Sequence, residues 1–174
     1  MKEIVKPIAV LAGICLVVTA LLAYINMVTS PIIAKAELKT KNEAMAEVLS
    51  EADGFTAVDT KLPEGVTEAY KANNGTGYVF MLSTKGYGGE IKLCCGIKQD
   101  GSIEQVKTLS HSETSGIGSK VVDNGSDYRT RYKGKTADTY DSVDAVTGAT
   151  ISSKAYKKAV AAAFEAYNTV KEAK

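Results

Sequence analysis

Residues 8–28 form a run of 21 amino acids without a charged side chain. A helix of this length extends about 31 Å, which matches the hydrocarbon core of a bilayer. We therefore predict a single membrane-spanning helix near the amino terminus. A cleavable signal peptide is the alternative, but its apolar region is normally shorter and ends at a small-residue cleavage site. No such site stands out after Val28.

The charges that flank this run do not determine its orientation. Lys2 and Lys6 precede it, whereas Lys35, Lys39 and Lys41 follow it, so both sides carry basic residues. The net charge of +1 over 174 residues, with no basic cluster, argues against nucleic acid as a partner. The rest of the chain is long enough for one modest globular domain.

A segment of two parts follows the predicted membrane helix. Ser30 before Pro31 is typical of a helix start, so we predict a helix over residues 31–49 that continues or follows the first. Residues 51–63 have the Asp, Gly, Thr and Pro content of a linker. The chain then divides into three parts, which are the tail and membrane anchor at 1–29, the juxtamembrane helix and linker at 30–63, and a domain at 64–174.

The domain shows strand periodicity first and helical periodicity last. Strands are predicted over residues 67–72, 78–84, 90–98 and 103–109, with hairpin turns between them. The third strand is the most regular, with Ile91, Leu93, Cys95 and Ile97 on one face and Glu90, Lys92, Cys94 and Lys98 on the other. A helix is predicted over residues 153–172. This order indicates an α+β fold, with a mostly antiparallel sheet flanked by helices.

The three cysteines give no sign of a metal site or a disulfide framework. Cys15 lies in the apolar run, and Cys94 and Cys95 are adjacent, which fits no metal-binding spacing. Neighbouring residues of a strand point to opposite faces, so we predict two ordinary small side chains.

The strongest chemical signal is the stretch Asp144-Ala145-Val146-Thr147-Gly148-Ala149-Thr150. Its Gly-Ala pair permits close approach to the backbone and lies between two hydroxyls. Ser152 and Ser153 directly downstream are predicted to cap the last helix, which places Thr150 where helical N–H groups and the dipole favour a phosphate. A loop that merely ends in a helix cap is the alternative interpretation.

Two glycine-containing segments accompany this motif. Residues 85–89 read Lys-Gly-Tyr-Gly-Gly and are predicted to form a turn between two strands. Residues 111–118 read His-Ser-Glu-Thr-Ser-Gly-Ile-Gly, in which His111, Ser112 and Glu113 supply the residue types of a hydrolase. Consecutive side chains rarely meet the geometry of a catalytic triad, so we favour a structural hydrogen bond for His111.

Together, the three segments resemble the FMN-binding domain family. Asp-x-x-Thr-Gly-Ala-Thr before a helix resembles its flavinylation motif, and Gly-Tyr-Gly-Gly before a strand resembles a second family segment. Residues 111–118 resemble its His-x-Glu-Thr-Pro-Gly-Leu-Gly loop, with Ser115 in place of proline and Ile117 in place of leucine. The family includes the G subunit of the Rnf ferredoxin:NAD oxidoreductase and the C subunit of the sodium-translocating NADH:quinone oxidoreductase. The modest chain length favours the Rnf branch.

The resemblance implies FMN joined through its phosphate to the hydroxyl of Thr150. It implies flavin contacts or recognition roles for Asp144, Thr147, Gly148, Ala149, Tyr87, His111, Glu113, Thr114, Gly116 and Gly118. We expect the glycines at 116 and 118 to bring their backbone close to the flavin or its phosphate. No residue is expected to be catalytic, and no metal site is expected.

A threonine hydroxyl is a poor nucleophile, and no base adjoins it in the motif, so attachment is expected to need a separate flavin transferase that uses FAD and magnesium. The implied function is electron relay within a redox-driven ion pump, with other membrane subunits as partners. The implied location is the cell membrane, as a single-pass protein in contact with lipid whose flavin domain is extracytoplasmic. A flavin-free scaffold module of the same fold, tethered to the membrane, is the alternative.

Overall fold

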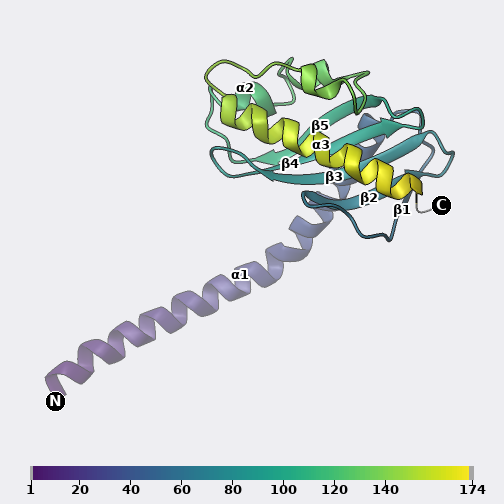
Figure 1. The fold of residues 1–174 in the computed structure, drawn as a ribbon. Coiled ribbons are helices and arrows are strands. Elements are labelled where there is room, and N and C mark those ends of the chain that lie inside the picture. Colours follow the sequence, from purple (N-terminus) through teal and green to yellow (C-terminus); the bar gives the residue numbers. More distant parts are fainter. Residues whose placement is uncertain (1, 173–174) are drawn as a thin grey trace. The chain divides into compact units, whose positions relative to one another are not determined.

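The computed structural model describes residues 2–172, and the chain forms two compact units, Met1–Thr40 and Lys41–Lys174. Helix α1 (Lys2–Val48) makes up the first unit and ends within the second (Figure 1). Among the described residues, it is the one helix long and apolar enough to cross a membrane. The apolar side chains of the uncharged run, residues 8–28, are exposed.

Helix α1 passes Ser30 and Pro31 without a break. The helix start predicted at Ser30 is wrong, whereas the second predicted helix continues the first, which is one of the two arrangements that the sequence left open. Proline removes only one N–H donor from a helix that is already formed on both sides. The Thr29 Oγ1 hydroxyl donates a hydrogen bond to the Ile25 carbonyl oxygen at 2.8 Å in the preceding turn.

The second unit is built on a five-stranded antiparallel sheet in which each strand pairs with the next along the chain. The strands are β1 (Phe55–Ala57), β2 (Val66–Ala72), β3 (Gly77–Lys85), β4 (Glu90–Lys98) and β5 (Ile103–His111). The four longer strands confirm the predicted ones. Strand β1 was not predicted, because three residues in a linker-like segment are too few to show alternation.

Helix α3 (Thr150–Glu172) lies across one face of the sheet (Figure 1). Three short helices precede it, which are α2 (Ser119–Val122), η1 (Arg129–Tyr132) and η2 (Tyr140–Ser142). The buried face of β4 confirms the predicted alternation, because Ile91, Leu93, Cys95 and Ile97 share one core with Tyr156, Val160 and Phe164 of α3. These contacts fix the direction of α3 over the sheet.

The opposite face of the sheet is covered by the end of α1. Ala44, Met45, Val48 and Leu49 form a second core with Val79, Met81 and Cys94. Cys94 and Cys95 therefore point to opposite faces, as predicted, and both are buried free thiols. The sheet is thus packed on both sides, although the sequence of β4 alone indicates one polar face.

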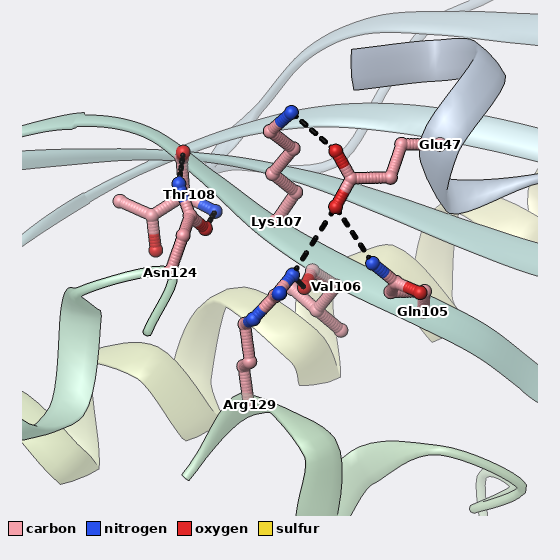
Figure 2. A network of polar contacts seen from close by, with 7 residues as sticks. All are labelled: Glu47, Gln105, Val106, Lys107, Thr108, Asn124 and Arg129. Carbon is pink, nitrogen blue, oxygen red and sulfur yellow. Dashed lines mark hydrogen bonds and ion pairs between the residues drawn. The ribbon is translucent and has the colours of Figure 1, made fainter. Parts of the chain in front are cut away.

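A polar network joins the end of α1 to β5 and η1 (Figure 2). The Glu47 carboxylate accepts hydrogen bonds from Lys107 Nζ at 2.5 Å, Gln105 Nε2 at 2.9 Å and Arg129 Nη1 at 3.5 Å. The Asn124 side chain extends the network, because it pairs with the N–H and carbonyl oxygen of one residue of β5, Thr108. These bonds attach the last turn of α1 to the sheet.

Gly96 of β4 lies directly beneath the end of α1, so we predict that any side chain there is destabilising. A Cβ atom at this position would lie 2.0 Å from the Val48 carbonyl oxygen. We expect Gly96→Ala to lower the free energy of unfolding by about 1–3 kcal/mol, the usual cost of overpacking. Thermal unfolding of the full-length protein in detergent measures this change. Gly125→Ala is the control, because a Cβ atom there meets nothing within 4 Å, and equal melting temperatures would contradict the packing.

Candidate functional site

A cavity of about 420 Å³ lies at the N-terminal end of α3. Its lining comes from the turn between β3 and β4, the loop after β5, and the first turn of α3. Seven of the predicted site residues line it, namely Tyr87, Glu113, Thr114, Gly118, Gly148, Ala149 and Thr150. The structure adds Ile117, Ile151 and Ser152 to them. The three sequence motifs therefore meet at one place.

Four predicted site residues do not line this cavity. Asp144 and Thr147 are exposed in the segment that leads into the motif, and Gly116 is exposed at the tip of its loop. His111 lines a separate, more polar depression with Asp123. Some of the residues that the motifs indicate therefore line the cavity, whereas these four lie outside it.

Thr150 is the first residue of α3 and is exposed. The chain reaches it through a tight turn in which Gly148 has a φ of +82° and the Ala149 N–H donates to the Val146 carbonyl oxygen at 2.9 Å. A φ in this range strongly favours glycine. The small residues of the motif thus turn the chain sharply and leave the Thr150 hydroxyl accessible.

The predicted N-caps, Ser152 and Ser153, lie inside the first turn of α3 instead, so that prediction is wrong. The Ser153 hydroxyl accepts a hydrogen bond from the Val146 N–H and donates one to the Ala149 carbonyl oxygen, both at 3.0 Å. The Ser152 hydroxyl donates to Glu113 Oε2 at 2.7 Å. One serine therefore braces the turn before the helix, and the other anchors the helix to the loop after β5.

Glu113 connects all three segments of the cavity wall. Its Oε1 accepts a hydrogen bond from the Gly88 N–H at 3.1 Å, and its Oε2 accepts the one from Ser152. The residue is only 9% exposed. In the described part of the chain, no ion pair joins this carboxylate to a cationic side chain. Its hydrogen bonds are therefore with neutral donors.

Glu113 also explains why two of the surrounding positions are glycines. A Cβ atom at Gly86 would lie 2.0 Å from Glu113 Oε1, and one at Gly118 would lie 2.2 Å from Glu113 Oε2. The space that we expected to serve the flavin at Gly118 is thus occupied by the protein's own carboxylate. At Gly116 a Cβ atom would meet nothing within 4 Å, but its φ of +80° still favours glycine.

His111 forms hydrogen bonds across its loop. Its Nδ1 accepts from the Glu113 N–H at 3.3 Å, and its Nε2 lies 3.0 Å from Asp123 Oδ1. The tautomer with hydrogen on Nε2 satisfies both contacts. Because both ring nitrogens are engaged away from Ser112, the geometry does not support a hydrolase triad.

An apolar rim surrounds the cavity. Within residues 41–172, the large hydrophobic side chains that remain exposed are Tyr87 at 72%, Ile117 at 55% and Ile151 at 55%. All three line the cavity. Together with an exposed hydroxyl at a helix N-terminus, they suit a ligand that has a flat apolar ring and a phosphate. Ile117 and Ile151 were not among the predicted site residues. The sequence contains one indication of them, because each is apolar and directly adjoins a motif glycine or Thr150.

A larger cavity of about 630 Å³ lies between the β2–β3 region and the middle of α3, and it contains none of the predicted site residues. We favour the smaller one, because the larger is lined by no residue of the Asp144–Thr150 motif and by only Lys85 and Gly89 of the glycine-containing segments. Within residues 2–172, no group of three or more His, Cys, Asp or Glu side chains is placed to hold a metal ion.

Comparisons with known proteins cover both units. The FMN-binding domain family model matches residues 86–165, which include the whole cavity lining, and the RnfG N-terminal region matches residues 1–48. The G subunit of the proton-translocating ferredoxin:NAD(+) oxidoreductase complex of Clostridium ljungdahlii is 32% identical to this chain, with 89% of this chain and 86% of that protein covered. The G subunit of the Na(+)-translocating complex of Acetobacterium woodii is 30% identical, with 97% and 94% covered. The G subunit of the ion-translocating oxidoreductase complex of Methanosarcina acetivorans is 32% identical, with 94% of each covered.

The contact between Gly118 and Glu113 predicts non-additive stability effects. Gly118→Ala should destabilise the protein, because the added methyl group overlaps the Glu113 carboxylate. In a Glu113→Ala background the same substitution should cost less, with a coupling of about 0.5–3 kcal/mol. Chemical denaturation of the four proteins in this cycle measures the coupling. Additive effects would show that the carboxylate does not fill the space beside Gly118.

Proposed function

Because the chain belongs to the family of G subunits of ion-translocating ferredoxin:NAD(+) oxidoreductase complexes, we propose that it is a membrane-anchored flavoprotein with FMN bound covalently to Thr150. As a member of this family, it is an electron-transfer subunit of an oxidoreductase complex. The observation that carries the proposal is the convergence of Thr150, the Tyr87 turn and residues 113–118 on one cavity.

The residues of the cavity fit FMN. The free N–H groups of the first turn of α3 and the helix dipole favour a phosphate on Thr150. The volume of about 420 Å³ falls within the range of small-molecule sites, about 300–1,000 Å³. The rim formed by Tyr87, Ile117 and Ile151 offers apolar contact for the ring system. When bound, FMN supplies one- and two-electron transfer, which no side chain of the site provides.

The site also supports attachment by a separate enzyme. Among the described residues, the one carboxylate in the cavity lining is that of Glu113, and it is engaged by Ser152 and Gly88, so it is not free to act as a base for Thr150. The exposed hydroxyl is instead accessible to a flavin transferase. In that reaction the Thr150 oxygen forms a bond to the FMN phosphorus of FAD, the pyrophosphate bond breaks, AMP leaves, and the hydroxyl proton passes to the transferase or to solvent. Asp144, exposed just before the motif turn, and Gly148 and Ala149 within that turn serve as recognition elements.

In the assembled complex, FMN held in this cavity would supply electron relay between two protein partners. Residues 8–28 anchor the chain in lipid as a single span, and the flavin domain, predicted at residues 64–174, lies outside the cytoplasm. A covalent tether suits that location, because a dissociated FMN would be lost where free FMN is scarce. A scaffold without flavin is the competing function, and protein purified from its host would then be colourless rather than yellow.

We predict that coexpression with a flavin transferase attaches FMN to Thr150 and to no other residue. Thr150→Ala should abolish the in-gel flavin fluorescence of the denatured protein, whereas Thr150→Ser retains the acceptor oxygen and should preserve part of it. Thr147→Ala is the matched control and should keep the label. Peptide mapping should find FMN minus one water on the peptide that contains Thr150. An adduct elsewhere, or fluorescence that survives Thr150→Ala, would refute the assignment.

The proposed topology predicts that a cysteine introduced at the exposed position Glu64 reacts with a membrane-impermeant maleimide in intact cells. Burial raises the pKa of the Cys95 thiol to about 12 and that of the Cys94 thiol well above its usual range. Neither native thiol should therefore react with the maleimide near neutral pH.

Cys15→Ala removes the remaining native thiol from this experiment. Lys6→Cys is the control on the other side of the membrane, and it should react only after the membrane is opened. The opposite pattern for the two positions would reverse the topology.

A further inference from the structure

The acidic side chain in the cavity wall has an unusual environment. The titratable side chains that line the cavity are Tyr87, which is largely exposed, and Glu113, which is more than nine-tenths buried. Both Glu113 oxygens accept hydrogen bonds, one from a backbone N–H and one from a hydroxyl. An acceptor at both oxygens is the pattern of an ionised carboxylate.

This negative charge has no cationic partner among the described residues. The lysines nearest in sequence to the three wall segments, Lys85, Lys120 and Lys154, are exposed and form no ion pair with Glu113. The donors that hold the carboxylate, Gly88 and Ser152, are neutral. A charge held in this way acts on its surroundings through a lower effective dielectric than water provides.

We propose that Glu113 tunes the flavin on Thr150 to a lower reduction potential, by placing a buried negative charge in the wall of the same cavity. The inference rests on the proposed attachment of FMN to Thr150. Each electron that the flavin accepts from a donor protein oxidises that donor by one electron and adds one negative charge to the ring, unless a proton follows from solvent. A fixed carboxylate nearby opposes this added charge and so favours the oxidised flavin.

The protein's hydrogen-bond geometry allows the charge to be removed with little structural change. In Glu113→Gln, the amide oxygen can accept from the Gly88 N–H, and the amide nitrogen can donate to the Ser152 hydroxyl, which also accepts hydrogen bonds. Both existing contacts are then retained. Three further variants separate charge from structure. Ser152→Ala removes one hydrogen bond but keeps the charge, Glu113→Asp keeps the charge but shifts its position, and Glu165→Gln removes an exposed carboxylate elsewhere on α3.

The experiment is a spectroelectrochemical titration of the full-length flavinylated protein in detergent, with attachment at Thr150 checked by mass for each variant. Glu113→Gln should shift the one-electron equilibrium toward the reduced flavin by about tenfold, which is a change of about 59 mV to more positive potential. Ser152→Ala, Glu113→Asp and Glu165→Gln should each stay much closer to the native potential. Thermal unfolding of each variant establishes that it is folded.

The possible outcomes are distinct. An unchanged or more negative potential in Glu113→Gln overturns the inference, and so does an equal shift in Glu113→Asp, because the effect would then come from geometry. If Glu113→Gln does not fold, Ser152→Ala and Glu113→Asp still test the inference, because both keep the charge and a large shift in both would overturn it. FMN missing from Thr150 in the native protein would instead refute the proposed function.

Discussion

The architecture of the site depends on the buried carboxylate of Glu113. It reaches from the loop after β5 to the turn between β3 and β4, through Gly88, and to the first turn of α3, through Ser152. The pairing of Ile91 with His111 already places the first two of these segments side by side, and the carboxylate joins both to α3. The carboxylate also fills the space beside Gly86 and Gly118, so two motif glycines are explained by one acidic side chain.

A buried carboxylate with only neutral donors is costly, because desolvation opposes the charged form. The fold provides part of the compensation through charge-assisted hydrogen bonds, which are stronger than neutral ones. Hydrophobic residues could join the same segments without that cost. A buried acidic group in the wall of a ligand-sized cavity therefore favours a role in the chemistry of the site as well as in its packing.

Alternation and helical spacing were sufficient to predict the longer strands and α3, because each pattern is set within one element. The Ile91 to Ile97 face of β4 is an example, since every second residue enters the core. The contacts of Glu113 were not predictable, because its partners lie 25 and 39 residues away. Cys94 shows a related limit. Its face of β4 is polar in sequence, and only the packing of Val48 and its neighbours explains why it is buried.

The site must keep one group accessible to an enzyme and other groups shielded from water, and a single exposed surface cannot do both. A maturation enzyme must reach the acceptor hydroxyl, so Thr150 has to be exposed, and it is. Groups that set the electronic environment act best when water is excluded, and Glu113 and Ser152 are buried. Because Ser152 is two residues after Thr150 on the same helical turn, one short segment meets both needs. The position of α3 over the sheet therefore fixes the distance between the acceptor oxygen and the buried charge.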